Sequence, residues 1–400
     1  MLAVVVATTA LSACSSATGG GNALVVNGAT LTNKQFQTFL NDIQGDADYV
    51  KAALSTQQGQ AITTTGDANS FSTAFTTQVL NQQVTFALAS QEVAKRGLTV
   101  SADDKARAQQ VLASNLSPTD PTTGQPAADG SGQKTLDDLG SFKNPLIDGV
   151  ANILAIQNDI TAKLSTDEAL QKAYDAGKDT YKNQACTSVI IIDGRSKDPA
   201  TGKAGAPTDA TSAAALAKAK GLSAQVTSPE TFASVAQASS DDQTTGAKGG
   251  DIGCAPVGAY AQSQPEIDAA IQAQPVGQVG APVKASFGYA LVLVRSRGDL
   301  TFEQAKPQLT AGISTAMKAA FQDWLTQAGK DASVSVDPQW GTWDKDNATV
   351  IAPEGATSTT TTADPNAPTS TPLSPEQLQQ LLGSAGASGG AGTSTPTSAP

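Results

Sequence analysis

Apolar residues recur at helical spacing in two long stretches of the chain, one on each side of its middle. Phe71–Arg96 contains no Pro or Gly until Gly97 ends it, and Thr301–Ala328 carries one apolar face made of Phe302, Leu309, Ile313, Met317, Phe321 and Trp324. Side chains three and four residues apart lie on the same face of a helix. These stretches therefore predict two long amphipathic helices.

Shorter helices are predicted around them, most with a residue suited to begin a helix. Thr32, Ser101 and Thr166 each precede an apolar or acidic run at helical spacing. A Ser or Thr hydroxyl at such a position accepts a hydrogen bond from a free backbone N–H of the first turn. Leu136–Leu164 is a further helical zone, and we expect a break near Pro145 because proline interrupts the helical hydrogen-bond ladder.

The middle of the chain shows strand patterns instead. Thr187–Ile192 and Tyr289–Val294 are short apolar runs that are typical of buried strands. The glycine-rich run Gly249–Gly253 lies between them and permits a sharp turn, since glycine adopts positive φ without steric cost. Helices are predicted at Ser212–Lys220 and Thr231–Ser239, so this part of the chain should form a small mixed unit.

Composition excludes several classes of function. The 400 residues include 25 basic and 36 acidic side chains, a net charge of −11, which argues against a nucleic-acid partner. The chain has no histidine, which excludes Ser-His-Asp and Cys-His catalysis and every histidine-containing metal site. Three cysteines are too few for a four-thiolate zinc site, and no phosphate-binding loop is found, so we expect neither a metal nor a cofactor.

Residues 1–14 have the pattern of a lipoprotein signal peptide. Leu2–Leu11 is apolar, and Leu11-Ser12-Ala13-Cys14 matches a bacterial lipobox, in which Cys14 would become the lipidated N-terminus. No Lys or Arg precedes Cys14, so the segment is atypical, and a short buried strand is the alternative interpretation. Residues 15–22 are rich in Ser and Gly and suit a linker.

The other two cysteines are Cys186 and Cys254. Export would place them in an oxidising compartment, where a pair of cysteines tends to form a disulfide. We therefore expect a Cys186–Cys254 disulfide, with two free buried thiols as the alternative.

The C-terminal part, residues 346–400, is predicted to be disordered. From Ile351 onward, Thr, Ser, Pro, Ala and Gly dominate, and Lys, Arg and aromatic residues are absent. Leu373–Gly383 is an exception, because Ser374 can cap a short helix, Pro375 suits its first position and Gly383 can end it. This segment is interpreted either as a docking motif or as residual helix.

An ordered set of motifs in the middle of the chain resembles the parvulin-type peptidyl-prolyl isomerase domain. The motifs are Phe232, Ala233 and Ala236, then Ser240-Asp241, Gly249-Gly250-Asp251-Ile252-Gly253 and Phe287-Gly288-Tyr289. The opening Val26-Asn27-Gly28 followed by a capped helix, and the closing segment Gln339–Trp343, resemble the chaperone regions of SurA- and PrsA-type foldases.

The resemblance implies an α+β fold. A helical chaperone domain, made from residues 23–184 and 299–345 together, would carry an inserted parvulin-like domain at residues 185–298. The inserted domain would be a four-stranded antiparallel sheet flanked by helices. We expect the closing segment Gln339–Trp343 to pack back on the N-terminal helices.

The resemblance also implies site residues, position by position. The family places histidines on its first and last strands, and the matching positions hold Ser188 and Ala290. The family's acidic or thiol position falls on Asp242, or on Asp241 if the alignment shifts by one. The apolar cup for a proline ring would be lined by five residues: Ile252, Tyr260, Ile267, Phe287 and Ala290.

Because both imidazoles are absent, we expect isomerase activity to be weak or lost, with Asp242 and Ser188 as the remaining candidate catalytic residues. Strand alternation would also place Cys186 on the face of Ser188 and Cys254 on the face of Ile252. A disulfide between these cysteines is therefore expected to face the groove.

These expectations describe an exported foldase, anchored to the outer face of a bacterial membrane by lipid at Cys14, that binds unfolded or extended secreted polypeptides. One alternative is an active parvulin-type isomerase that uses Asp242. Another is a cell-envelope scaffold that reaches a partner through its tail, in which case deletion of residues 351–400 would abolish function.

Overall fold

The computed structural model describes residues 21–50, 63–64, 67–118, 125–197 and 204–353. Contacts divide the chain into two compact units. The first, here called the helical unit, comprises residues 1–164 and 313–400, and the second, the sheet unit, comprises residues 165–312. Each unit is described by itself.

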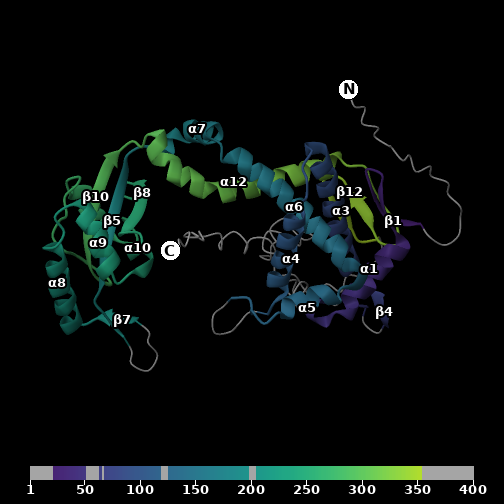
Figure 1. The fold of residues 1–400 in the computed structure, drawn as a ribbon, viewed down its shortest axis with the longest axis horizontal. Coiled ribbons are helices and arrows are strands. Elements are labelled where there is room, and N and C mark those ends of the chain that lie inside the picture. The colour runs from purple at the N-terminus through teal and green to yellow at the C-terminus, as the bar shows by residue number, and fades with distance from the viewer. Residues whose placement is uncertain (1–20, 51–62, 65–66, 119–124, 198–203, 354–400) are drawn as a thin grey trace, which may run out of the picture. The chain divides into compact units, whose positions relative to one another are not determined.

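The helical unit is built on helices that the sequence pattern largely predicts. They are α1 (Asn33–Gly45), α2 (Ala47–Tyr49), α3 (Thr73–Arg96), α4 (Ala102–Leu116), α5 (Ser131–Asp138) and α6 (Lys143–Leu164). Thr32 and Ser101 cap α1 and α4 as expected, and Gly97 ends α3 in the left-handed conformation. Helices α3 and α4 both lie against α6 (Figure 1), and their apolar faces form one continuous core.

The break expected near Pro145 lies earlier in the chain. A 3-10 turn, η2 (Gly140–Phe142), separates α5 from α6, and Pro145 occupies the first turn of α6. Backbone N–H groups of a first turn have no partner within their own helix, so proline is tolerated there.

Both ends of the chain meet in the helical unit. Strand β1 (Asn22–Val26) lies between β2 (Ala29–Thr32) and β11 (Val334–Val336) in an antiparallel sheet. The Trp340 indole packs edge-on against Phe36 and donates a hydrogen bond of 2.6 Å to Asn33. The expectation that the closing segment packs back on the N-terminal helices is confirmed.

The helical unit extends further toward the C-terminus than the sequence suggests. Strands β12 (Thr342–Asp344) and β13 (Thr349–Ile351) form a hairpin, although residues from 346 onward were assigned to a disordered tail. The Asn81 side chain of α3 accepts the Val350 N–H at 2.7 Å and donates to the Val350 carbonyl at 3.2 Å. These two hydrogen bonds take the place of those that a neighbouring strand would make, and they fix β13 to α3. The rest of the predicted tail, residues 354–400, lies outside the described residues.

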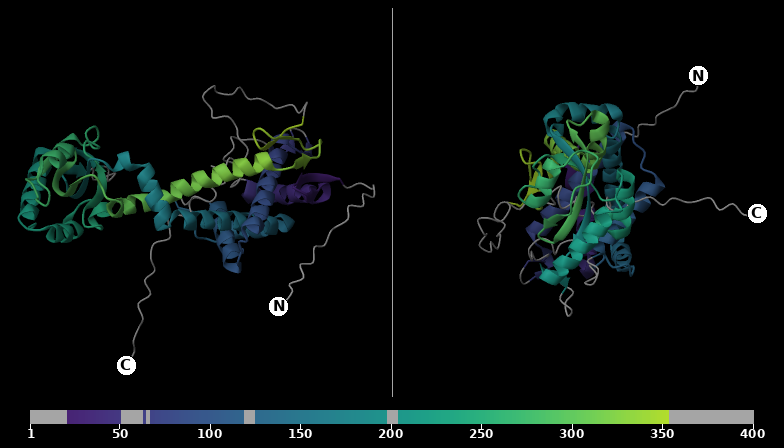
Figure 2. Two further views of the ribbon diagram at one scale, coloured as in Figure 1. Left: turned by 90° about the horizontal axis from the view of Figure 1, so that it is seen from above. Right: turned by 90° about the vertical axis from the view of Figure 1, so that its left-hand side faces the viewer.

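The sheet unit contains the four-stranded antiparallel sheet implied by the resemblance. Its strands are β5 (Gln184–Asp193), β8 (Asp251–Pro256), β9 (Val283–Ala285) and β10 (Gly288–Gly298), in the order β8-β5-β10-β9. Figure 2 shows this unit from two further directions. Strand β5 is central and almost fully buried, which agrees with its continuous apolar sequence.

Helices cover both faces of this sheet. Helices α8 (Asp209–Ser223) and α9 (Pro229–Ser239) pack on one face, and α11 (Pro265–Ala273) packs on the other. The short helix α10 (Gln243–Gly246) contacts β5 and β8. Further elements of this unit are α7 (Asp167–Ala176), the 3-10 turn η3 (Lys178–Tyr181), β6 (Arg195–Lys197) and β7 (Ala204–Pro207).

The fold class is confirmed as α+β, with a helical unit made from both ends of the chain and an inserted sheet unit. The contact boundaries, however, differ from the expected ones. The sheet unit begins at Ser165 rather than 185 and ends at Gly312 rather than 298. Helix α12 (Phe302–Asp331) begins in the sheet unit and ends in the helical unit, so no loop marks the second boundary.

Candidate functional site

The sheet face covered by α11 gathers the five side chains that were expected to line an apolar cup. Ile252 comes from β8, Tyr260 from the following loop, Ile267 from α11, Phe287 from the turn before β10, and Ala290 from β10 itself. All five belong to one apolar cluster, here called the groove cluster, which also contains Val189, Val292 and Val294. The structure therefore brings together side chains from four separate segments of the sheet unit.

The five side chains divide into a floor and a rim. Ala290 is fully buried and Ile267 is 6% exposed, so both form the floor. Ile252, Tyr260 and Phe287 are only partly buried and present apolar surface to solvent. A ligand could bind to these three rim side chains without opening the core.

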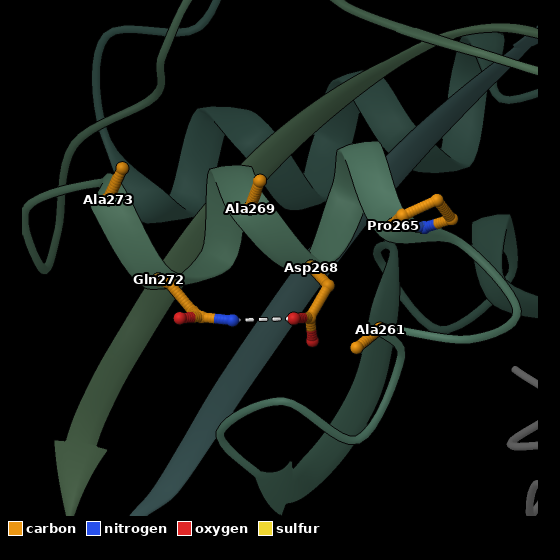
Figure 3. Close-up of a pocket in the computed structure, with 6 residues that line it drawn as sticks. All are labelled: Ala261, Pro265, Asp268, Ala269, Gln272 and Ala273. Carbon is orange, nitrogen blue, oxygen red and sulfur yellow. Dashed lines mark hydrogen bonds between the residues drawn. The ribbon is translucent and has the colours of Figure 1, made fainter.

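A buried carboxylate holds the Tyr260 loop against α11. Asp268 is 2% exposed and accepts hydrogen bonds from the Tyr260 N–H at 3.2 Å and from the Gln272 side chain at 2.6 Å. Its neighbours line a shallow depression of about 450 Å³ on α11 and the preceding loop (Figure 3). Burial also raises the pKa of Tyr260 above its ordinary value. Sequence reasoning missed Asp268, because an acid in the first turn of a helix ordinarily faces solvent.

The glycine-rich turn fixes the position of Ile252. Gly250 has φ of +81°, and a Cβ there would lie 2.5 Å from the Val189 carbonyl oxygen, so only glycine fits. The Gly250 carbonyl accepts the Val189 N–H at 2.8 Å, which joins the turn to the central strand. The chain then enters β8 with Ile252 in the groove cluster.

Asp242 caps α10. Its carboxylate accepts hydrogen bonds from the Thr244 N–H at 3.2 Å and from the Thr245 hydroxyl at 2.5 Å. The Thr245 hydroxyl holds the pKa of this carboxyl below its ordinary value. The carboxylate of Asp242 is ionised at neutral pH, and both of these hydrogen bonds come from residues of α10. This arrangement suits a structural helix cap.

Asp241, the other residue considered for the acidic position, is also occupied. Its carboxylate accepts the Asp193 N–H at 2.9 Å and an ammonium hydrogen bond from Lys218 at 2.7 Å. These contacts fasten the segment after α9 to the end of β5.

The structure places Ser188 on the face of β5 opposite the groove cluster, and its candidate catalytic role stays a prediction. Side chains alternate along β5, and Val189 and Ile191 belong to the groove cluster while Ile190 and Ile192 pack on the opposite face. Ser188 shares the face of Ile190, is 4% exposed and pairs with Leu293 of β10.

By the same alternation, the neighbouring Thr187 lies on the face of β5 that carries Val189 and the groove cluster. It is 1% exposed, and within the described residues its hydroxyl has no hydrogen-bond partner. Counting every second residue back from Val189 in the sequence would have identified Thr187 as a residue of this face.

A disulfide joins Cys186 and Cys254, which are paired across β5 and β8. The expectation that it faces the groove is wrong. Both cysteines lie in a separate cluster with Tyr174 and Leu300, near the start of α12. The pairing of β5 with β8 shifts between Cys186 and Ser188, so an extra residue near Gly253 separates Cys254 from the face of Ile252.

The groove can supply apolar contact but little acid–base chemistry. The whole chain lacks imidazole, and Ala290 offers only a methyl group where the family pattern has a histidine. In the described ranges, no group of His, Cys, Asp or Glu side chains could hold a metal ion. None of the described helices is long and apolar enough to span a membrane, and the expected lipidation site Cys14 lies outside the described residues.

Comparison with known proteins agrees with this geometry. Residues 199–296 match the family described as rotamase, PPIC-type PPIase domain. The match begins after β5, so it includes the glycine-rich turn and most of β10 but not Ser188.

Curated relatives include two proteins named chaperone SurA. The protein from Alkalilimnicola ehrlichii is 32% identical over 120 residues, which cover 29% of this chain and 27% of that protein. The protein from Aromatoleum aromaticum is 36% identical over 111 residues, covering 27% of this chain and 24% of that protein. The chain thus spans about a quarter of the length of the curated relatives it matches.

Among solved structures, the foldase PrsA of Lactococcus lactis is 14% identical, with 79% of this chain and 94% of that chain covered and a TM-score of 0.36. Residues 199–296 thus contain a parvulin-type, PPIC-family domain, and over about 120 residues the chain is similar to chaperone SurA.

Proposed function

We propose that this protein is an extracytoplasmic folding factor that binds unfolded or extended secreted polypeptides through its groove cluster, with isomerase activity weak or lost. Anchoring by lipid at Cys14 to the outer face of the bacterial membrane is part of this proposal. The observation that supports it most directly is the partly exposed apolar surface of Ile252, Tyr260 and Phe287, which share one cluster with the buried Ala290.

The chemistry of proline isomerisation favours binding over catalysis at this site. Rotation about the peptide bond crosses a barrier of about 18–20 kcal/mol, and an enzyme must favour the twisted amide. The groove retains an apolar surface for a proline ring but has no imidazole. Asp242, the retained acid, is engaged in capping α10. The remaining groups can therefore hold a proline-containing segment without lowering the barrier greatly.

A proline-tetrapeptide isomerisation assay tests the loss of catalysis. We expect the protein to accelerate isomerisation less than about twofold, and the substitution Asp242→Ala to leave that rate unchanged. The cap lost in this variant costs about 1 kcal/mol of stability, so Asp242→Asn serves as a control that retains a capping oxygen. Clear catalysis that falls in Asp242→Ala would instead establish an active isomerase.

Binding of clients is tested by placing charges on the rim. The double variant Ile252→Asp, Phe287→Asp is expected to bind an apolar proline-containing peptide at least tenfold more weakly, and to suppress aggregation of a denatured client less well. Each buried apolar side chain contributes about 1.5–3 kcal/mol, so losing two contacts is more than sufficient. Peptide fluorescence anisotropy and client light scattering measure these effects.

Val276→Asp is the matched control for this experiment. Val276 is 48% exposed, lies in the sheet unit and is outside the groove cluster. It should retain the parent affinity. Equal loss of binding in both variants would show that general surface apolarity, and not the groove, binds the peptide.

A further inference from the structure

The helical unit contains an apolar pocket that the proposed groove does not involve. It measures about 310 Å³ and lies between the β1–β2 hairpin, α1, α3 and α6. Its apolar lining includes Leu24, Leu31, Phe39, Phe86 and Ala87. Pockets lined in this way bind apolar side chains, because transfer out of water supplies the free energy.

A glycine of α6 shapes one wall of this pocket. A Cβ at Gly149 would lie 2.3 Å from the Phe86 ring, so the ring rests directly on the helix backbone. Both residues line the pocket. The wall is therefore an aromatic ring held in place by close backbone contact.

The pocket also contains a hydrogen-bond donor without a partner. Gln83 lines the pocket, and its Nε2 is buried with no hydrogen-bond partner in the part of the chain that the structure describes. A buried amide N–H that lacks a partner costs about 1–3 kcal/mol. A ligand carbonyl oxygen could accept from this amide once the Gln83 side chain turns toward the pocket, and would then recover that free energy.

The charges of the pocket indicate a neutral ligand. Asp148 is the one ionisable side chain among the lining residues, and it pairs with Lys105 at 2.7 Å. The acid is therefore already compensated, and the ligand should carry apolar side chains and amide or backbone oxygens.

A segment of this chain outside the described residues has this chemistry. In residues 354–400 the large apolar side chains are four leucines, which all fall within Leu373–Leu382. Leu378, Leu381 and Leu382 have the spacing of one helix face, and the segment carries three glutamines and a single charge, Glu376.

The described chain ends close enough for this segment to reach the pocket. Pro353 follows β13, which is fixed to α3 through Asn81, and α3 itself provides pocket residues from Gln83 to Ser90. A tether of residues 354–372 has a root-mean-square span of about 25 Å, while a helix with its side chains is about 10–12 Å wide. The tether can therefore pass around α3 to the pocket.

We propose that Leu373–Leu382 docks in this pocket, with its leucine face against Leu31, Phe39 and Phe86, and that the Gln83 side chain turns to donate to a carbonyl oxygen of the segment. The segment would then be an internal ligand of the helical unit. This proposal does not depend on the function proposed for the groove.

Competition with a free peptide tests the docking in the full chain. The probe is a fluorescent synthetic peptide with the sequence of residues 371–384. In the parent chain the tethered segment is present at an effective concentration of about 1 mM, so it should exclude the free peptide. In the triple variant Leu378→Asp, Leu381→Asp, Leu382→Asp the pocket is free, and we expect the peptide to bind at least tenfold more tightly.

Two matched controls locate the effect. Thr359→Asp, Thr360→Asp, Thr361→Asp adds the same charge to the tail and should still exclude the peptide. In the triple leucine variant, Ser90→Asp at the exposed rim of the pocket should abolish peptide binding, whereas Ala94→Asp, exposed on the next turn of α3 and outside the lining, should not.

Three results would overturn the proposal. The first is equal peptide affinity for the parent and the triple leucine variant, and the second is absence of binding to that variant. The third is peptide binding to that variant that is unchanged by Ser90→Asp. Light scattering decides whether the docking is internal: a parent chain that is dimeric, and becomes monomeric in the triple leucine variant, would show that the segment occupies a second copy.

Discussion

Removal of the Cys186–Cys254 disulfide is expected to lower the free energy of unfolding of the sheet unit by about 4 kcal/mol. The two cysteines are 68 residues apart, and a cross-link of that length removes about 4 kcal/mol of chain entropy from the unfolded state. It joins the central strand β5 to the edge strand β8, which carries Ile252. Without it, the edge strand and the rim of the groove should exchange amide hydrogens faster.

Urea unfolding of the double variant Cys186→Ala, Cys254→Ala measures this loss. All three tryptophans, Trp324, Trp340 and Trp343, belong to the helical unit, so their fluorescence provides an internal control. Hydrogen exchange in β5 and β8 should report the destabilisation, while the tryptophan transition should stay within about 0.5 kcal/mol. A sheet unit as stable as that of the parent would contradict the prediction.

The substitution Gly288→Ala should destabilise the sheet unit by about 3–4 kcal/mol. Gly288 has φ of +140°, where residues with a side chain are strained by about 1–3 kcal/mol. An added Cβ would also lie 2.4 Å from both the Gly194 nitrogen and the Ile192 carbonyl oxygen. Both atoms belong to the backbone at the end of β5, which is paired with β10 and cannot withdraw without disturbing the sheet, so overlap adds about 1–3 kcal/mol.

Gly298→Ala separates the two contributions. Gly298 ends the same strand with φ of +134°, but an added Cβ would meet nothing within 4 Å. It should therefore show the conformational cost alone, about 1–3 kcal/mol. Equal losses in the two variants, measured by hydrogen exchange of β5 and β10, would show that the close approach to Gly194 and Ile192 contributes nothing.

The sequence was most informative where one local rule decides the structure. Hydroxyl caps at Thr32 and Ser101 and the apolar runs of β5 and β10 predicted their elements, because each depends on neighbours in the chain. The resemblance to parvulins then placed Ile252, Tyr260, Ile267, Phe287 and Ala290 in one cluster. The roles of these side chains in binding remain predictions.

The errors arose where a single extra residue reverses which face a side chain occupies. Simple alternation placed Cys254 beside Ile252, but the shifted pairing near Gly253 separates them. Ser188, which the resemblance matches to a family histidine, lies on the face of Ile190 by alternation along β5, and its catalytic role stays a prediction. Neither register nor bulge is encoded by composition or spacing alone.

Contacts between residues that are distant in the sequence could not be predicted from the sequence pattern either. Asn81 looks like an ordinary polar residue on a helix, and its pairing with Val350 needs the whole unit to be assembled. The buried carboxylate of Asp268 likewise acquires its partners only when the Tyr260 loop folds over α11.

The pairing of β1 with β11 sets an order of events during synthesis. Residues 165–312 are contiguous and can fold as soon as they emerge, whereas the first 164 residues must wait for Val334–Val336 to complete their sheet and for Phe321 to fill their core. Until those residues are synthesised, the N-terminal portion thus resembles the nascent chains that the finished protein is proposed to assist.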